Sequence, residues 1–297
     1  MNRFLISIGG ALLAFAMTAG SASAYVVDID NFTVVKNGIT VLNDTFGDGT
    51  PPPNGPNGAA TYGVGAGATF TEGGGTATMT TATGGSNVFG GVNFTRHTAV
   101  FRTNTEPLST SELGLKSDDT ISVSGLFDMF IPAAPRESFG VLLTDRVVGP
   151  DPQNPISAGD DELEMRVVRT PANQLLIQFA HLTYDPDTTS PIAGTSLLGA
   201  VGAAALADLT NDQILLQLDK LSAGSDTITA SFEYFDNGLS LGGLQSFANT
   251  FDIFNGEDYT RAGFNARIAR DVPEPATLAV FAIGLAGLGL ARRRPRR

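Results

Sequence analysis

The chain has 297 residues with 30 acidic and 18 basic side chains, a formal net charge of −12, and neither cysteine nor tryptophan. The lack of cysteine excludes a disulfide framework, a thiolate metal site and a cysteine nucleophile. The acidic charge argues against nucleic-acid binding, which needs clustered lysine and arginine. A hydrophobic share of 42% supports a folded core, and the length suits one large β domain or two small ones.

Residues 1–24 have the pattern of a secretory signal peptide. Arg3 supplies the positive start, the apolar run from Phe4 to Met17 follows, and Ala22 and Ala24 are small residues at positions −3 and −1 of a cleavage site. We therefore predict export with removal of residues 1–24 by signal peptidase. The alternative is an uncleaved membrane anchor.

Residues 25–270 are predicted to form the folded body of the protein. The six basic and two acidic side chains outside this range leave the body with a formal charge near −16. Such a charge keeps an exported protein soluble and repels polyanions.

The segment 47–91 is of low complexity and rich in glycine, threonine, alanine and asparagine. Threonine favours strands and glycine weakens them, so we predict long loops with one or two thin strands. The alternative is a disordered linker between two domains.

Apolar and polar residues alternate through much of the remaining body. The alternating segments are 121–129, 163–168, 175–181, 214–218 and 228–234, and turn clusters such as Asp236-Asn237-Gly238 separate them. This pattern predicts short antiparallel strands in a sandwich with one buried and one wet face per sheet. Leu197–Leu209 is the one stretch with helical character, and 262–268 is predicted as a closing strand.

The order of these segments resembles a concanavalin A-like jelly roll of the laminin G or legume-lectin type. The resemblance is carried by Phe139–Leu143, Glu162–Arg166, Ile214–Leu218 and Ile228–Phe235. It implies an all-β, antiparallel β-sandwich for the body.

Asp160, Glu162 and Glu164 are the strongest catalytic candidates. Alternate residues of a strand point to one face, and successive carboxylates would lie about 6.6–6.8 Å apart, near the spacing of glycosidase acids. The run resembles the Glu-x-Asp-x-Glu of some jelly-roll glycoside hydrolases, with the residue types exchanged at Asp160 and Glu162. Sugar-cleaving grooves usually carry tryptophan, which is missing here, so the other interpretation is a solvated strand face and a protein that is not an enzyme.

Metal and cofactor sites have little support in the sequence. The two histidines, His97 and His181, show no zinc or catalytic-triad spacing and are predicted to be structural or at the surface. Calcium is the one ion considered, with carboxylates in loops and at strand ends as candidate ligands; the alternative is that these aspartates form turns. The candidates are Asp44, Asp48, Asp151, Asp160, Asp161, Asp185 and Asp187.

The last 27 residues, 271–297, have a three-part order. Val272, Pro273, Glu274 and Pro275 come first, the uncharged residues 276–291 follow, and the end carries Arg292, Arg293, Arg294, Arg296 and Arg297. As a helix, residues 276–291 would span about 24 Å, short of a hydrocarbon core of about 30 Å. The arginines would hold the end of the chain in the cytoplasm.

This order resembles the PEP-CTERM sorting-signal family of Gram-negative bacteria. The resemblance implies recognition of Pro273, Glu274 and Pro275 by an exosortase, transient anchoring in the inner membrane through 276–291, and delivery to the cell surface. An ordinary tail anchor with a proline-rich linker is the alternative.

We therefore expect an exported surface or extracellular-matrix protein. Its body would be a non-enzymatic glycan-binding or structural module linked to exopolysaccharide and biofilm. The alternatives are a glycan hydrolase or lyase that uses Asp160, Glu162 and Glu164, and adhesion between identical domains through sheet edges.

Overall fold

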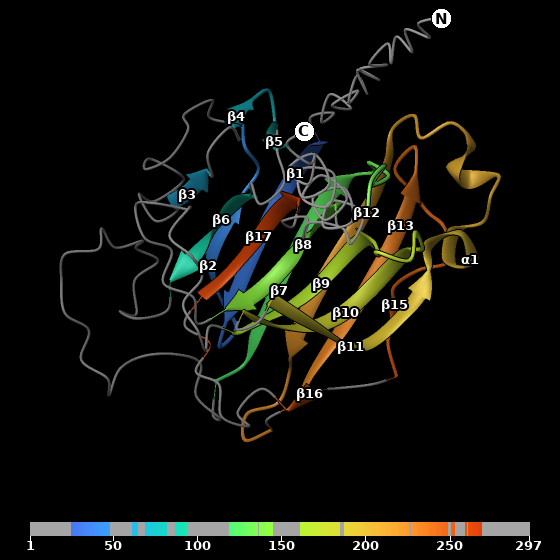
Figure 1. Cartoon of the computed structure of the whole chain (residues 1–297). Helices are drawn as coiled ribbons and strands as arrows, with labels where there is room; N and C mark the ends of the chain where they lie inside the picture. Colours follow the sequence, from blue (N-terminus) through green and yellow to red (C-terminus); the bar gives the residue numbers. More distant parts are fainter. Residues whose placement is uncertain are drawn as a thin grey trace, which may run out of the picture.

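The chain forms two antiparallel β-sheets that pack face to face, an arrangement consistent with a jelly-roll-like fold (Figure 1). The computed structural model describes residues 25–47, 61–64, 69–81, 87–93, 119–135, 137–144, 161–184, 187–225, 227–248, 251–252, 259 and 261–268. The predicted signal peptide and the C-terminal tail lie outside these residues. Within them, no helix is long and apolar enough to cross a bilayer.

Sheet A has ten strands among these residues, with the main order β14-β13-β12-β7-β1-β5-β4. β2 also pairs with β1, and the short β15 and β16 pair with β13. The strands are β1 (Tyr25–Lys36), β2 (Ile39–Asp44), β4 (Thr69–Gly73), β5 (Thr76–Thr81), β7 (Ile121–Asp128), β12 (Asp212–Lys220), β13 (Thr227–Asp236), β14 (Leu239–Ser240), β15 (Gln245–Ser246) and β16 (Phe251–Asp252).

Among the residues that the structure describes, sheet B has seven strands, in the order β11-β10-β9-β8-β17-β6-β3. They are β3 (Thr61–Val64), β6 (Asn87–Asn93), β8 (Glu137–Thr144), β9 (Asp161–Arg169), β10 (Leu175–Tyr184), β11 (Asp187–Ser196) and β17 (Arg261–Ile268). The predicted closing strand is confirmed as β17, and it lies inside the sheet between β6 and β8.

Residues 47–91 contain more strand than the sequence predicted. The expectation of one or two thin strands is wrong, because β3, β4, β5 and β6 all begin in this segment. In β5, Ala77 and Met79 are buried while threonines alternate with them, so a threonine-rich strand still has an apolar face. Gly74 and Gly75 adopt positive φ angles of 71° and 94°, which makes them the turn of the β4–β5 hairpin.

The helical stretch predicted at 197–209 forms two short helices, α1 (Leu197–Val201) and the 3-10 helix η1 (Ala205–Ala207). Ser196 caps α1, since its side chain accepts a hydrogen bond from the Gly199 amide. Leu197 is buried in the main core, and Ala200 and Val201 of the same helix are partly buried against it, so α1 packs onto the sandwich through these three residues.

The core lies between the two sheets. Phe264 on β17 has its ring centroid 4.9 Å from that of Phe32 on β1 and 5.9 Å from that of Phe46, both in edge-on arrangements. Such contacts add to the burial of apolar area. These three rings therefore join sheet B to sheet A.

The outer faces of the two sheets differ in exposure. In β7 of sheet A, buried and partly exposed residues alternate along the strand, as an antiparallel sheet with one wet face requires. In β8 of sheet B, all eight residues are buried. The face of sheet B that points away from sheet A is therefore also covered, and this face carries the predicted carboxylates.

Candidate functional site

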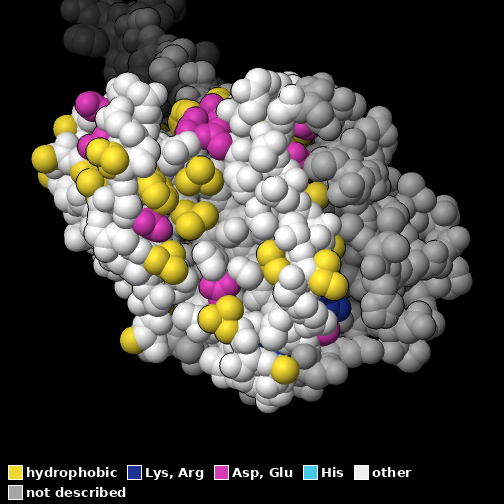
Figure 2. All heavy atoms as spheres, turned by 180° about the vertical axis from the view of Figure 1, so that it is seen from behind, with side chains coloured by type: hydrophobic (Ala, Val, Ile, Leu, Met, Phe, Trp, Pro, Cys, Tyr) yellow, Lys and Arg dark blue, Asp and Glu magenta, His cyan; other side chains and the backbone are white. Residues whose placement is uncertain are grey.

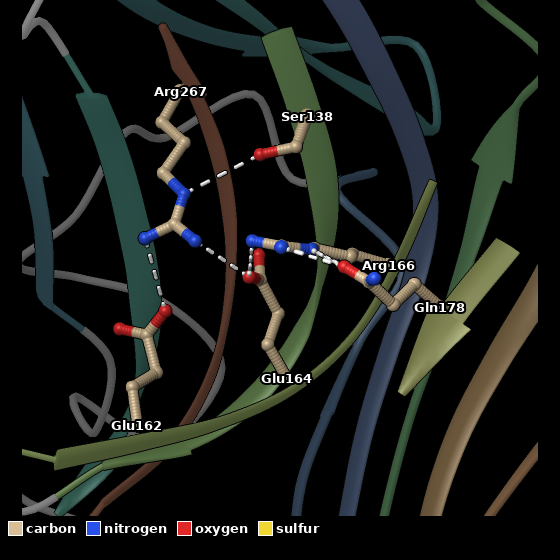
Figure 3. Close-up of polar contacts among 6 residues, drawn as sticks. All are labelled: Ser138, Glu162, Glu164, Arg166, Gln178 and Arg267. Carbon is tan, nitrogen blue, oxygen red and sulfur yellow. Dashed lines mark hydrogen bonds and ion pairs between the residues drawn. The ribbon is translucent and has the colours of Figure 1, made fainter. Parts of the chain in front are cut away.

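A group of buried and partly buried polar and charged side chains occupies the outer face of sheet B (Figure 3). We call it the sheet B cluster. Four strands supply its members, which are Ser138 from β8, Glu162, Glu164 and Arg166 from β9, Gln178 from β10, and Arg267 from β17.

Ion pairs hold the centre of the sheet B cluster. Glu164 Oε2 accepts hydrogen bonds from Arg166 Nη1 at 2.9 Å and from Arg267 Nη2 at 2.7 Å. Arg267 Nη1 lies 3.3 Å from Glu162 Oε1. Figure 3 shows Arg267 on β17 reaching across β8 toward both glutamates of β9. One arginine thus links two carboxylates on β9 to β17.

Neutral groups bind the remaining guanidinium nitrogens. Arg166 Nε and Nη2 donate to Gln178 Oε1 at 3.1 and 2.7 Å, and Arg267 Nε donates to Ser138 Oγ at 3.3 Å. Planar guanidinium groups suit such forked hydrogen bonding. The cluster therefore connects β17, β8, β9 and β10 through side chains as well as through their backbone ladder.

The cluster is almost closed to solvent and its formal charges balance. Glu164 is fully buried, and Glu162 and Arg166 are only 3% and 6% exposed. Burial lowers the pKa of Arg166, Glu164 opposes this effect, and Arg267 adds to it. Buried charges are tolerated when they are paired and hydrogen-bonded. Two carboxylates and two guanidinium groups provide that pairing here.

Two buried acceptor oxygens of this face make no hydrogen bond to the part of the chain that the structure describes. They are Glu164 Oε1 and Asn265 Oδ1. Asn265 on β17 is opposite Gly140, which is in turn opposite Arg166. Each oxygen can accept a hydrogen bond from a water molecule or from a hydroxyl group of a ligand.

Gly140 on β8 leaves no room for a side chain, because β9 approaches it closely. A Cβ atom at Gly140 would meet Met165 O at 2.3 Å and Arg166 Cα at 2.9 Å. Both neighbours are backbone atoms, which cannot move aside without breaking the β8–β9 pairing. The glycine is therefore required by close approach of the two strands.

The prediction that Glu162 and Glu164 share one strand face is confirmed, since both belong to the cluster on the outer face of β9. Asp160 lies outside the described residues. The sequence interpretation missed Arg166, Gln178 and Arg267. Arg166 could have been found, because it continues the same alternate positions along β9, whereas the other two depend on strand pairing.

The calcium candidates are only partly within the structure. Asp44 ends β2 and is buried, and its Oδ1 accepts the Phe46 amide at 2.9 Å, which is the geometry of an aspartate turn. Asp161 begins β9 and Asp187 begins β11, while Asp48, Asp151 and Asp185 lie outside the described residues. Among the residues described, no group of three or more His, Asp or Glu side chains could hold a metal ion.

Only one of the two histidines, His181, lies among the described residues. His181 lies on β10, partly buried and opposite Leu163 of β9. His97 falls outside the described residues. Calcium binding and the structural role of both histidines stay predictions.

A second polar group lies on the outer face of sheet A. Gln213 Nε2 donates to Asp128 Oδ1 at 3.4 Å and also to Asp30 Oδ2. Partial burial and the nearby carboxylate of Asp30 raise the pKa of Asp128 from 3.8 to about 6, and the hydrogen bond from Gln213 opposes this. Asp128 is thus a carboxyl group that holds its proton more tightly in the folded state.

This shift gives a testable pH dependence. Because the folded-state pKa of Asp128 is raised, its contribution to stability is full below about pH 3.8 and is lost as pH rises through about 6. We expect Asp128→Asn, which resembles the protonated form, to flatten the dependence of the melting temperature on pH between 4 and 6. The variant should also melt higher than the natural protein at pH 7. An unchanged slope in this range would contradict the assignment.

Comparison with known proteins identifies the C-terminal tail. Residues 271–297 match the PEP-CTERM protein-sorting motif, which confirms the prediction made from Pro273, Glu274, Pro275 and the arginine-rich end. The motif marks an exported protein that is processed by an exosortase. No curated protein and no solved structure matches the chain.

Proposed function

We propose that this exported, exosortase-processed protein serves at the cell surface or in the extracellular matrix as a non-enzymatic module that binds or organises exopolysaccharide. The sorting motif supports the destination. The acidic body supports solubility outside the cell. The β-sandwich supplies broad sheet faces on which a polymer can lie.

One observation carries the non-enzymatic part of the proposal: the two glutamates of β9 are held in buried ion pairs. A general acid has to reach the leaving group and transfer a proton, and a nucleophile has to reach the sugar ring. Glu162 is 3% exposed and Glu164 is fully buried, and Glu164 Oε2 is fixed between two arginines. This arrangement favours a role in holding sheet B together.

The outer face of sheet A is the more suitable surface for a polymer. Thr33, Ser124 and Gln217 lie in register across β1, β7 and β12, and all three are partly exposed. Hydroxyl and amide groups can donate to and accept from sugar hydroxyls. Asp28, Asp30 and Asp128 on the same sheet would repel an anionic polymer, so a neutral polysaccharide fits best.

The route of export is part of the proposal. Signal peptidase would cut after Ala24, and residues 276–291 would anchor the chain in the inner membrane until the exosortase removes the tail. A chain that begins at Tyr25 keeps every described strand, because β1 starts at this residue and pairs Tyr25 with Thr81 of β5. Tyr25 is 5% exposed, so the first residue of the mature chain belongs to the folded body.

The proposal is tested with processed protein recovered from culture medium and with the polysaccharide of the producing cells. We expect co-sedimentation with the polymer, and we expect Gln217→Ala with Ser124→Ala to weaken it. The matched control is Gln245→Ala with Ser240→Ala, on β15 and β14. Reducing ends and unsaturated products are measured in the same samples. Product release that Glu164→Gln abolishes while circular dichroism shows the variant to be folded would instead support the hydrolase or lyase.

A further inference from the structure

Exposed leucines gather at one corner of the sandwich. Figure 2 shows hydrophobic side chains together on the side of the molecule where β13 and α1 lie. We call the four exposed leucines there the leucine patch: Leu198 in α1, Leu239 in β14, and Leu241 and Leu244 between β14 and β15. They are 51%, 72%, 38% and 51% exposed. Clustered exposed leucines commonly mark an interaction surface.

Strand register places Leu239 at the end of sheet A where the body begins. Tyr25 starts β1, and Ile29 four residues later is opposite Phe127, next to the end of β7. At that end, Asp128 of β7 is opposite Gln213 of β12. The residue before it, Asp212, is opposite Asp236 at the end of β13, and Asp236 pairs with Leu239 of β14. Tyr25 and Leu239 therefore lie at the same end of the sheet.

The last described strand ends there as well. Residues 129–136 connect the end of β7 to Glu137, the first residue of β8, and Glu137 is opposite Ile268 at the end of β17. Arg169, the last residue of β9, donates from Nε to Pro132 O in this connection, so β9 also ends here. Leu175 at the start of β10 is opposite Arg169, and the next residue, Leu176, pairs with Ser196 at the end of β11, where α1 begins. The leucine patch and the point at which the chain leaves toward its tail share one end of the body.

The connection to the sorting tail is short. Residues 269–275 separate Ile268 from the apolar segment that begins at Ala276. Eight residue steps span at most about 28 Å when fully extended. With the tail in a bilayer, this end of the body would lie close to the lipid headgroups, which add about 5–8 Å on each side of the hydrocarbon core.

We propose that the leucine patch rests on the lipid surface of the membrane while the tail anchors the chain, and so orients the body for processing. This rests on the tail anchoring of the proposed function. The lipid headgroups that the patch contacts are zwitterionic, because Asp128, Asp208 and Asp236 lie at the same end of the body and anionic headgroups would repel them. Removal of the tail then releases a contact that is too small to hold the body alone.

The full chain, reconstituted in phosphatidylcholine vesicles, tests this directly. Because the protein has no cysteine, a single environment-sensitive fluorophore can be placed by Leu239→Cys or Leu198→Cys. Ile39→Cys and Leu221→Cys are matched controls, since both residues are at least 70% exposed and lie where β1 and β12 end, at the opposite end. Ala282→Cys reports on the tail.

We expect a blue shift and quenching by headgroup nitroxides at positions 239 and 198, and none at 39 and 221. Leu239→Ser with Leu244→Ser should abolish the signal at 198, and phosphatidylglycerol should reduce it. Equal, water-like emission at 239 and 39 with a buried label at 282 overturns the contact and leaves the anchoring intact. An aqueous label at 282 overturns both.

Two further results would also overturn the lipid contact. A shift at 239 that requires added exosortase would assign the patch to the enzyme. A shift that grows with protein concentration in the absence of vesicles would assign it to a second copy of the chain.

Discussion

Glu164→Gln is expected to destabilise the protein by about 3–5 kcal/mol, the range for removing one partner of a buried ion pair. The carboxylate accepts hydrogen bonds from Arg166 and Arg267, and its loss leaves two guanidinium groups in a buried site with one carboxylate. Glutamine keeps the shape, so the effect comes from charge and hydrogen bonding. Urea denaturation followed by circular dichroism measures it.

The matched control for this variant is Glu233→Gln on β13. Glu233 is a partly exposed carboxylate on the outer face of sheet A, where surface substitutions usually change stability by less than about 0.5 kcal/mol. Equal effects of the two variants would show that the sheet B cluster does not stabilise the fold. A double-mutant cycle of Glu164→Gln with Arg267→Gln isolates the coupling between the two charges.

Gly140→Ala is expected to cost at least about 3 kcal/mol or to prevent folding, at the upper end of overpacking effects. The added methyl group would lie 2.3 Å from the carbonyl oxygen of Met165, so β8 and β9 would have to separate. The separation would also move Arg267 on β17 away from Glu164 on β9. Thermal unfolding and the yield of folded protein report the change.

Gly73→Ala is the control for this backbone clash. Gly73 also belongs to a strand, but a methyl group there meets no atom within 4 Å and its φ angle is not among the positive ones. We expect little change or slight stabilisation. If Gly140→Ala unfolded at the same temperature as Gly73→Ala, the close approach of β8 and β9 would not be needed for the fold.

The sequence predicted best those strands whose two faces differ. β7 alternates along its whole length and β12 from Asp212 to Leu218, because one face meets the core and the other is partly exposed, and this periodicity is visible in the sequence. The hairpin at Asn237 and Gly238 was also predictable, since both residues take the positive φ angles that such turns require. The glycine- and threonine-rich strands were missed because their composition hides their alternation.

The site was predictable only where it is local in the chain. Glu162 and Glu164 share a face because side chains alternate along a strand, and Arg166 follows the same rule. Arg267 reaches Glu164 across 103 residues of sequence, and this contact depends on β17 lying beside β8. Strand order of this kind is set by packing of the whole sandwich, so no local sequence pattern predicts it.

The central claim is that the chain is exported and cut at both ends, and the mass of the protein recovered outside the cell tests it most directly. We expect a polypeptide that begins at Tyr25 and has lost its end near Glu274. A recovered protein that still carried Arg292–Arg297, or one that stayed in the inner membrane of cells that contain the exosortase, would contradict the claim.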